Sequence, residues 1–98
     1  MIAAREVSSR ELLDIFVERI ETLDEAVNAV VTLDLDRARA AADAADAATA
    51  AGTATGALHG VPITVKDALA VDGVRSTGGA TELADHVATT DADVVALV

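Results

Sequence analysis

The stretch from Leu58 to Asp67 reads L-H-G-V-P-I-T-V-K-D, and it holds both the one proline and the one lysine of the chain. Pro62 pushes the residue before it into an extended conformation, and in a sheet it is tolerated at the first residues of a strand or on an edge. Two of the three residues that follow it are β-branched and apolar. We therefore predict a strand over 61–65 that ends at Lys66.

Toward the N-terminus, an S-x-x-E pattern at Ser8 and Glu11 forms a capping box, which predicts that a helix begins at Ser8. Apolar residues then recur at helical spacing and form one broad face. The members of this face are Leu12, Leu13, Phe16, Val17, Ile20 and Leu23.

Between this helix and the quoted stretch, the pattern changes twice. Residues 27–35 alternate with a period of two, which predicts a second strand. Residues 37–51 are mostly alanine and predict a helix that Asp36 caps and Gly52 ends. The resulting order, helix–strand–helix–strand, predicts an α/β fold.

Composition excludes several classes of function. The net charge is −10, with 17 acidic against 7 basic residues, which disfavours nucleic acid or an anionic membrane as a direct partner. Cysteine is absent and Phe16 is the sole aromatic residue, so thiolate sites and base-stacking platforms are excluded. No apolar run is long enough to span a membrane. The early Arg5 and Glu6 do not resemble a secretory leader, so we expect a cytoplasmic protein.

Lys66 is the residue most suggestive of chemistry. Strand alternation places it on one side with Thr64, while Asp67 points away, so a simple Lys66–Asp67 ion pair is not expected. A lysine drawn into partial burial loses preference for its charged form and can act as a base. The alternative is that Lys66 only marks the exit of the strand into water. Spacing alone leaves both interpretations open.

The segment from Leu58 to Asp67 closely resembles the lysine-bearing segment of the amidase signature family, roughly L-x-G-[IV]-P-x-x-x-K-D. The run Ser76-Thr77-Gly78-Gly79 resembles the next motif of that family, although Ala80 stands where the family usually has serine. The resemblance implies that residues 1–98 are the N-terminal fragment of a single amidase domain. It also implies an incomplete piece of a mixed-sheet α/β fold.

The resemblance further implies hydrolysis of carboxamides by a Ser–cis-Ser–Lys triad, with Lys66 as the base. Both serines of the triad would lie beyond residue 98. Ser8 and Ser9 are interpreted as capping residues, and Ser76 alone does not make a triad. We therefore expect the 98 residues to be inactive by themselves. The alternatives are a fragment of the glutamine-hydrolysing A subunit of a tRNA-dependent amidotransferase and a non-catalytic relic or interaction fragment.

No cofactor or metal is expected. His59 and His86 are the two imidazoles, and neither has the companions that a metal site requires, so both are interpreted as core or surface residues. The expected partner is a small-molecule amide substrate of the full-length enzyme. We also expect the fragment to associate with itself through unpaired strand edges and its apolar helix face.

Overall fold

The computed structural model describes residues 2–98. The chain divides into two compact units, one ending at Ile63 and the other running from Thr64 to Val98. The first unit holds the helices α1 (Ser9–Leu23) and α2 (Leu35–Ala51), with the short 3-10 helix η1 (Asp24–Ala26) between them.

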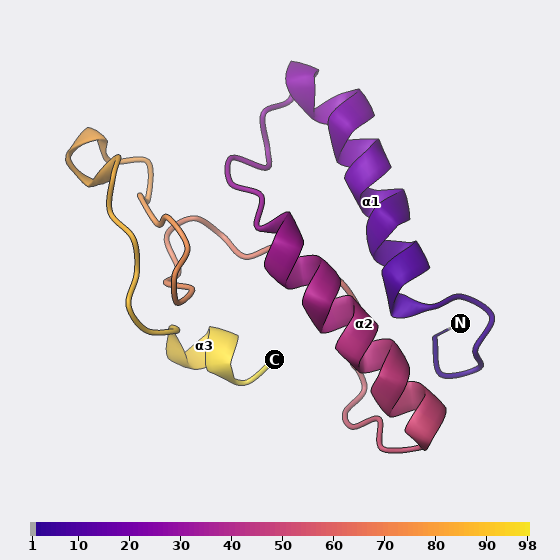
Figure 1. Cartoon of the computed structure of the whole chain (residues 1–98). Helices are drawn as coiled ribbons and strands as arrows, with labels where there is room; N and C mark the ends of the chain where they lie inside the picture. The colour runs from indigo at the N-terminus through magenta and orange to yellow at the C-terminus, as the bar shows by residue number, and fades with distance from the viewer. Residues whose placement is uncertain (1) are drawn as a thin grey trace. The chain divides into compact units, whose positions relative to one another are not determined.

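In Figure 1, α1 and α2 lie side by side and run in opposite directions. Their contact surface is small. Leu13 and Val17 of α1 are buried against Ala42 of α2, with Leu35 and Ala38 packed around them. Alanine side chains contribute little area each but allow two helices to approach closely. The alanine-rich sequence therefore gives a helix pair whose interface buries only a few residues.

The start of α1 is the most tightly bonded point of the first unit. The hydroxyl oxygen of Ser8 accepts the N–H of Glu11, and the Glu11 carboxylate accepts the N–H of Ser8. The predicted capping box is therefore confirmed. A second carboxylate comes from α2. Asp46 accepts the N–H of Ser9 through Oδ1 (2.7 Å) and that of Arg10 through Oδ2 (3.0 Å). These bonds satisfy N–H groups that a helix start leaves without an internal partner.

The ionised state of the Asp46 carboxylate favours its contact with the start of α1. Partial burial raises the pKa of Asp46, but the two N–H donors outweigh it and hold the pKa below the ordinary 3.8. Nearby, the Arg10 guanidinium bridges Asp14 of its own helix and Asp43 of α2. Such exposed ion pairs contribute little each, so the Asp46 contact is the one that matters for stability.

Gly60 packs against this helix start. Gly60 has a φ of +74°, and a Cβ built on it would overlap Oγ of Ser9. Ser9 itself is fully buried. The adjacent His59 places Nε2 3.0 Å from the carbonyl oxygen of Ala45 in α2. The glycine of the quoted motif is therefore required both by its left-handed backbone and by its close approach to α1.

The second unit, Thr64–Val98, contains the 3-10 helix η2 (Thr81–Leu83) and the four-residue helix α3 (Asp93–Ala96). Two of its segments run antiparallel to each other. The N–H of Ser76 donates to the carbonyl of His86 (3.0 Å), and the N–H of Ala88 donates to that of Val74 (3.1 Å). Ala88 is buried. One isolated bridge, Arg75 to Val87, is the sole β pairing in the described residues.

The predicted strands are therefore corrected. Within residues 2–98, neither 27–35 nor 61–65 forms a strand, and no sheet is present. In the first segment, Asn28 takes a φ of +51°, and the Asp24 carboxylate captures the N–H groups of Ala29 and Val30. Those donors would otherwise serve a strand ladder. The second segment forms no β pairing in the described residues, and a strand is defined by such pairing.

The alanine-rich helix is confirmed with one change at its start. It ends as predicted at Gly52, which has a φ of +73° and occupies the left-handed cap position. It begins at Leu35, however, with Asp34 as the cap residue, so Asp36 lies inside the first turn. A carboxylate there still favours the helix, because it lies near the positive end of the helix dipole. No helix in residues 2–98 combines the length and the apolar character needed to cross a membrane.

We predict that Asp46→Ala lowers the free energy of unfolding by about 1–2 kcal/mol, the usual cost of losing a capping carboxylate. Urea unfolding of the full chain, followed by far-UV circular dichroism, measures this. Asp43→Ala is the matched control, because it removes an exposed acidic residue from the same helix. The contribution of Asp46 should be complete above the ordinary carboxyl pKa and lost as pH falls through its lowered value. Equal effects of the two substitutions would contradict this role.

We also predict that Gly60→Ala destabilises the chain by at least about 1 kcal/mol more than Gly56→Ala. Gly56 has a similar φ, +77°, but nothing lies within 4 Å of the position that a Cβ would take there, so it isolates the backbone cost. Ser9→Ala removes the Oγ that the new Cβ would meet and should recover part of the Gly60→Ala loss. The same unfolding assay compares these variants with the wild type. Equal losses of stability in Gly60→Ala and Gly56→Ala would show that the contact with Ser9 adds no cost.

Candidate functional site

Lys66 lies near the beginning of the second unit, directly after the irregular residues 61–65. Its side chain is exposed. Of the two interpretations left open by the sequence, partial burial and exit into water, the described residues 2–98 show the exposed lysine of the second. A turn begins at Lys66, because its carbonyl oxygen accepts the N–H of Leu69 at 2.8 Å. The lysine thus stands on a segment whose backbone is held, while its amine faces solvent.

The neighbouring Asp67 bonds to the glycine-rich loop ten residues further along the chain. Its Oδ1 accepts the N–H of Thr77 (3.0 Å), and its Oδ2 accepts the Thr77 hydroxyl. Its backbone carbonyl accepts the hydroxyl of Ser76 (2.8 Å) and the N–H of Gly78 (3.3 Å). The carboxylate is directed to Thr77, in agreement with the expectation that Asp67 does not form a simple ion pair with Lys66.

Electrostatics follows this geometry. The hydroxyl and N–H of Thr77 hold the pKa of Asp67 below its ordinary value of 3.8, because both donate to the ionised carboxylate. The hydrogen bonds therefore persist throughout the neutral range. They would weaken only as pH falls through that lowered pKa, where the carboxylate takes up a proton.

The N–H groups of the loop are already occupied. The N–H of Gly79 donates to Oγ1 of Thr77 (3.1 Å), and that of Ala80 donates to the carbonyl of Thr77 (2.9 Å). Gly78 and Gly79 both have positive φ values, 57° and 78°, which allow the chain to turn back within two residues. The loop is therefore bonded to itself and to Asp67. In this conformation its N–H groups are not available to bind an oxyanion.

The serines are also engaged. The hydroxyl of Ser76 donates to a backbone carbonyl, and Ser8 caps α1 as predicted. Ser9 is fully buried. None of the three lies in a site that would activate a nucleophile, which needs an adjacent base and access to substrate.

The two histidines occupy ordinary positions. His59 is half-buried and contacts the backbone of α2, whereas His86 is exposed and takes part in the antiparallel pairing of the second unit. Across residues 2–98, no three His, Cys, Asp or Glu side chains come together in a group that could hold a metal ion.

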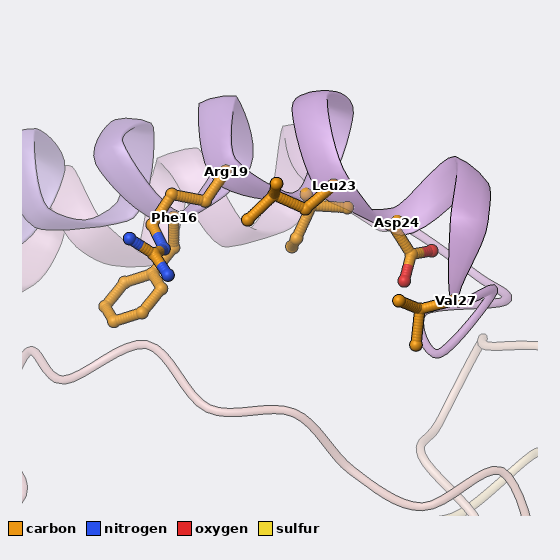
Figure 2. Close-up of a pocket in the computed structure, with 6 residues that line it drawn as sticks. Phe16, Arg19, Leu23, Asp24 and Val27 are labelled. Atoms are coloured by element: carbon orange, nitrogen blue, oxygen red, sulfur yellow. The ribbon is translucent and has the colours of Figure 1, made fainter.

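A shallow apolar hollow lies on the first unit, at the C-terminal half of α1 and η1. Figure 2 shows Phe16, Leu23 and Val27 facing it, with Arg19 and Asp24 beside them. Ile20 also lines it. The hollow is lined by members of the apolar face predicted for α1 and by none of the candidate catalytic residues, and it holds no nucleophile. Its lining is that of a surface for contact with other apolar groups, so we do not regard it as a catalytic site.

Asp67 is the residue whose role sequence analysis missed. The pattern that could have indicated it is a carboxylate after a predicted strand, followed by a loop of Ser, Thr and Gly. Short polar side chains in such loops bond readily to backbone N–H groups. The distance of ten residues between Asp67 and Thr77 hid the pairing, because it depends on how the intervening chain turns.

Comparison with known proteins finds similarity over nearly the whole chain. The family model described as Amidase matches residues 11–98. Two similar relatives are A subunits of glutamyl-tRNA(Gln) amidotransferase. The one from Aromatoleum aromaticum is 48% identical over 97% of this chain, and the one from Halorhodospira halophila is 49% identical over 94%. An acylamidase from Rhodococcus erythropolis is 38% identical over 96%.

The chain spans about a fifth of the length of these relatives, 19% of the two amidotransferase subunits and 20% of the acylamidase. The region of similarity includes both the segment that ends in Lys66 and Asp67 and the glycine-rich loop bonded to it. The family model alone covers far more than half of the chain. This chain belongs to the amidase family.

Proposed function

We propose that these residues supply the lysine base of an enzyme that cleaves carboxamides, as the N-terminal part of one amidase domain. The observation that carries the proposal is that the family match extends over residues 11–98 and includes Lys66, the only lysine of the chain, within its G-V-P-x-x-x-K-D motif. Within these 98 residues, Lys66 is the one lysine and stands at the lysine position of that motif, which supports its assignment to this role.

In the proposed mechanism, the neutral amine of Lys66 accepts a proton from a bridging serine, which in turn accepts one from a nucleophilic serine. The nucleophilic oxygen attacks the amide carbonyl carbon, and the carbon–nitrogen bond breaks as the leaving amine takes up a proton. Water then hydrolyses the acyl-enzyme. Both serines would come from sequence outside these 98 residues, so the chain by itself is proposed to be inactive.

The exposure of Lys66 sets a condition on this mechanism. A lysine accepts a proton only when it is neutral, and burial is what favours the neutral form. In the relatives, about four fifths of the protein lies outside the matched region. We infer that such a remainder would cover Lys66 and supply the desolvation that the isolated chain lacks.

A second candidate is the glutamine-hydrolysing component of a tRNA-dependent amidotransferase. The observation that favours it is identity, 48% and 49% to two subunits with that name against 38% to an acylamidase. Both candidates use the same bond cleavage and differ in substrate. Under the second candidate, the amide would be that of glutamine, and partner subunits would be required for transfer of the released ammonia.

The test is a hybrid enzyme in which residues 1–98 replace the matching region of the Halorhodospira halophila relative. We predict ammonia release from a carboxamide, and a kcat at least about 100-fold lower in Lys66→Ala, the loss typical of removing a general base. Lys66→Arg should be equally impaired, because a guanidinium keeps its proton. Asp85→Asn, an exposed carboxylate in the same unit, is the matched control.

The hybrid tests the role of Lys66 under both candidates, because they share the bond cleavage. About four fifths of its length comes from the amidotransferase relative, so its preferred substrate reports on that relative and not on this chain. Acetylation of Lys66 should be slower in the hybrid than in the free chain if the remainder covers the amine. An active hybrid whose turnover survives Lys66→Ala would refute the proposed role of Lys66.

A further inference from the structure

The two family motifs in the second unit are joined through a single residue. Asp67 accepts two hydrogen bonds on its carboxylate, both from Thr77, and two on its backbone carbonyl, from Ser76 and Gly78. All four donors belong to the loop of residues 76–79, and every acceptor belongs to the residue directly after Lys66. The loop therefore donates hydrogen bonds to both the side-chain and the main-chain oxygens of Asp67.

Lys66 shares this restraint through its own backbone. Its carbonyl oxygen accepts the N–H of Leu69, which closes a turn over residues 66–69. Asp67 occupies the second position of that turn, so its bonds to the loop restrict the rotation of the turn as a whole. Holding Asp67 in place limits the position of the Lys66 backbone, from which the lysine side chain extends, although Asp67 does not touch the amine.

Thr77 is the link that makes the arrangement specific. Its hydroxyl donates to Asp67 while its Oγ1 accepts the N–H of Gly79. One hydroxyl thus connects the carboxylate to the far side of the loop. A serine can perform the same two tasks, but a valine of nearly the same shape can perform neither.

We propose that Asp67 is a positioning residue: through Thr77 it holds the loop of residues 76–79 and the Lys66 turn as one rigid piece, so that the base is presented in a fixed direction. This inference rests on the proposed function for its catalytic consequence, whereas the rigid piece itself is a property of the 98-residue chain. The loop acts by holding position and not as an oxyanion donor, since its N–H groups are spent on these bonds.

Amide hydrogen exchange on the full 98-residue chain, resolved by NMR, tests the rigid piece. In Asp67→Asn, the N–H groups of Thr77, Gly79 and Leu69 should exchange about tenfold faster, the change expected when a charge-assisted hydrogen bond is lost. Thr77→Val should reproduce the effect at Gly79, and Thr77→Ser should restore wild-type rates. Asp85→Asn, which removes the same charge elsewhere in the unit, should change none of them.

The Leu69 amide separates positioning from a purely local role. Faster exchange at Thr77 and Gly79 with an unchanged Leu69 would show that Asp67 organises the loop but not the Lys66 turn, and would overturn the proposal. Unchanged exchange at Thr77 would overturn it as well. In wild type, the Thr77 amide shift should titrate with a midpoint below 3.8, following the lowered pKa of the Asp67 carboxylate.

The hybrid enzyme supplies the catalytic readout. Asp67→Asn should lower kcat about tenfold and leave KM unchanged, because orientation of the base is lost while substrate contacts remain. An unchanged kcat in a variant with a loosened loop would overturn the positioning role. An inactive hybrid with the native residues would instead count against the proposed function, and the exchange rates would still decide whether the rigid piece exists.

Discussion

The contact between the Asp46 carboxylate and the first N–H groups of α1 is the interaction on which the first unit depends. The apolar centre of the helix pair is only a few residues wide, so it does not by itself determine how the two helices meet. A carboxylate of α2 that bonds the N–H groups of Ser9 and Arg10 sets one end of the pair. Ser9 then becomes the surface against which Gly60 packs.

The second unit uses the same physical device on a smaller scale. Asp67 accepts N–H and hydroxyl donors from a loop, as Asp46 accepts N–H donors from a helix start. Both carboxylates have lowered pKa values for this reason. In a chain with so little buried apolar area, hydrogen bonds to ionised groups take over part of the task of specifying structure, since they are directional and stronger than neutral ones.

The first unit leaves apolar side chains of α1 exposed, and these belong to a chain of the amidase family. Part of the broad apolar face of α1 is not covered by α2, with Phe16 46% and Leu23 54% exposed. The matched relatives are about five times as long. Phe16, Leu23 and Lys66 all lie within the residues that match the family model.

Local rules were sufficient for the helices and the family. The capping box at Ser8, the alanine run and the left-handed Gly52 depend on residues within a few positions of each other, and the motif ending at Asp67 was readable as a string. The strands over 27–35 and 61–65 were not predictable in this way, because a strand exists only through a partner. In the first, Asp24 and Asn28 also redirected the backbone.

Tertiary structure alone decided which carboxylates carry the contacts. Asp43 and Asp46 look equivalent in the alanine-rich sequence, yet only Asp46 reaches the backbone at the start of α1. Asp67 and Thr77 lie ten residues apart, and nothing local pairs them. The sequence by itself therefore determined α1 and α2, the end of α2 at Gly52 and the family, since these follow from neighbouring residues. The fold determined the Ser9–Gly60 contact and the Asp67–Thr77 link, since both require distant segments to be brought within hydrogen-bonding or van der Waals distance.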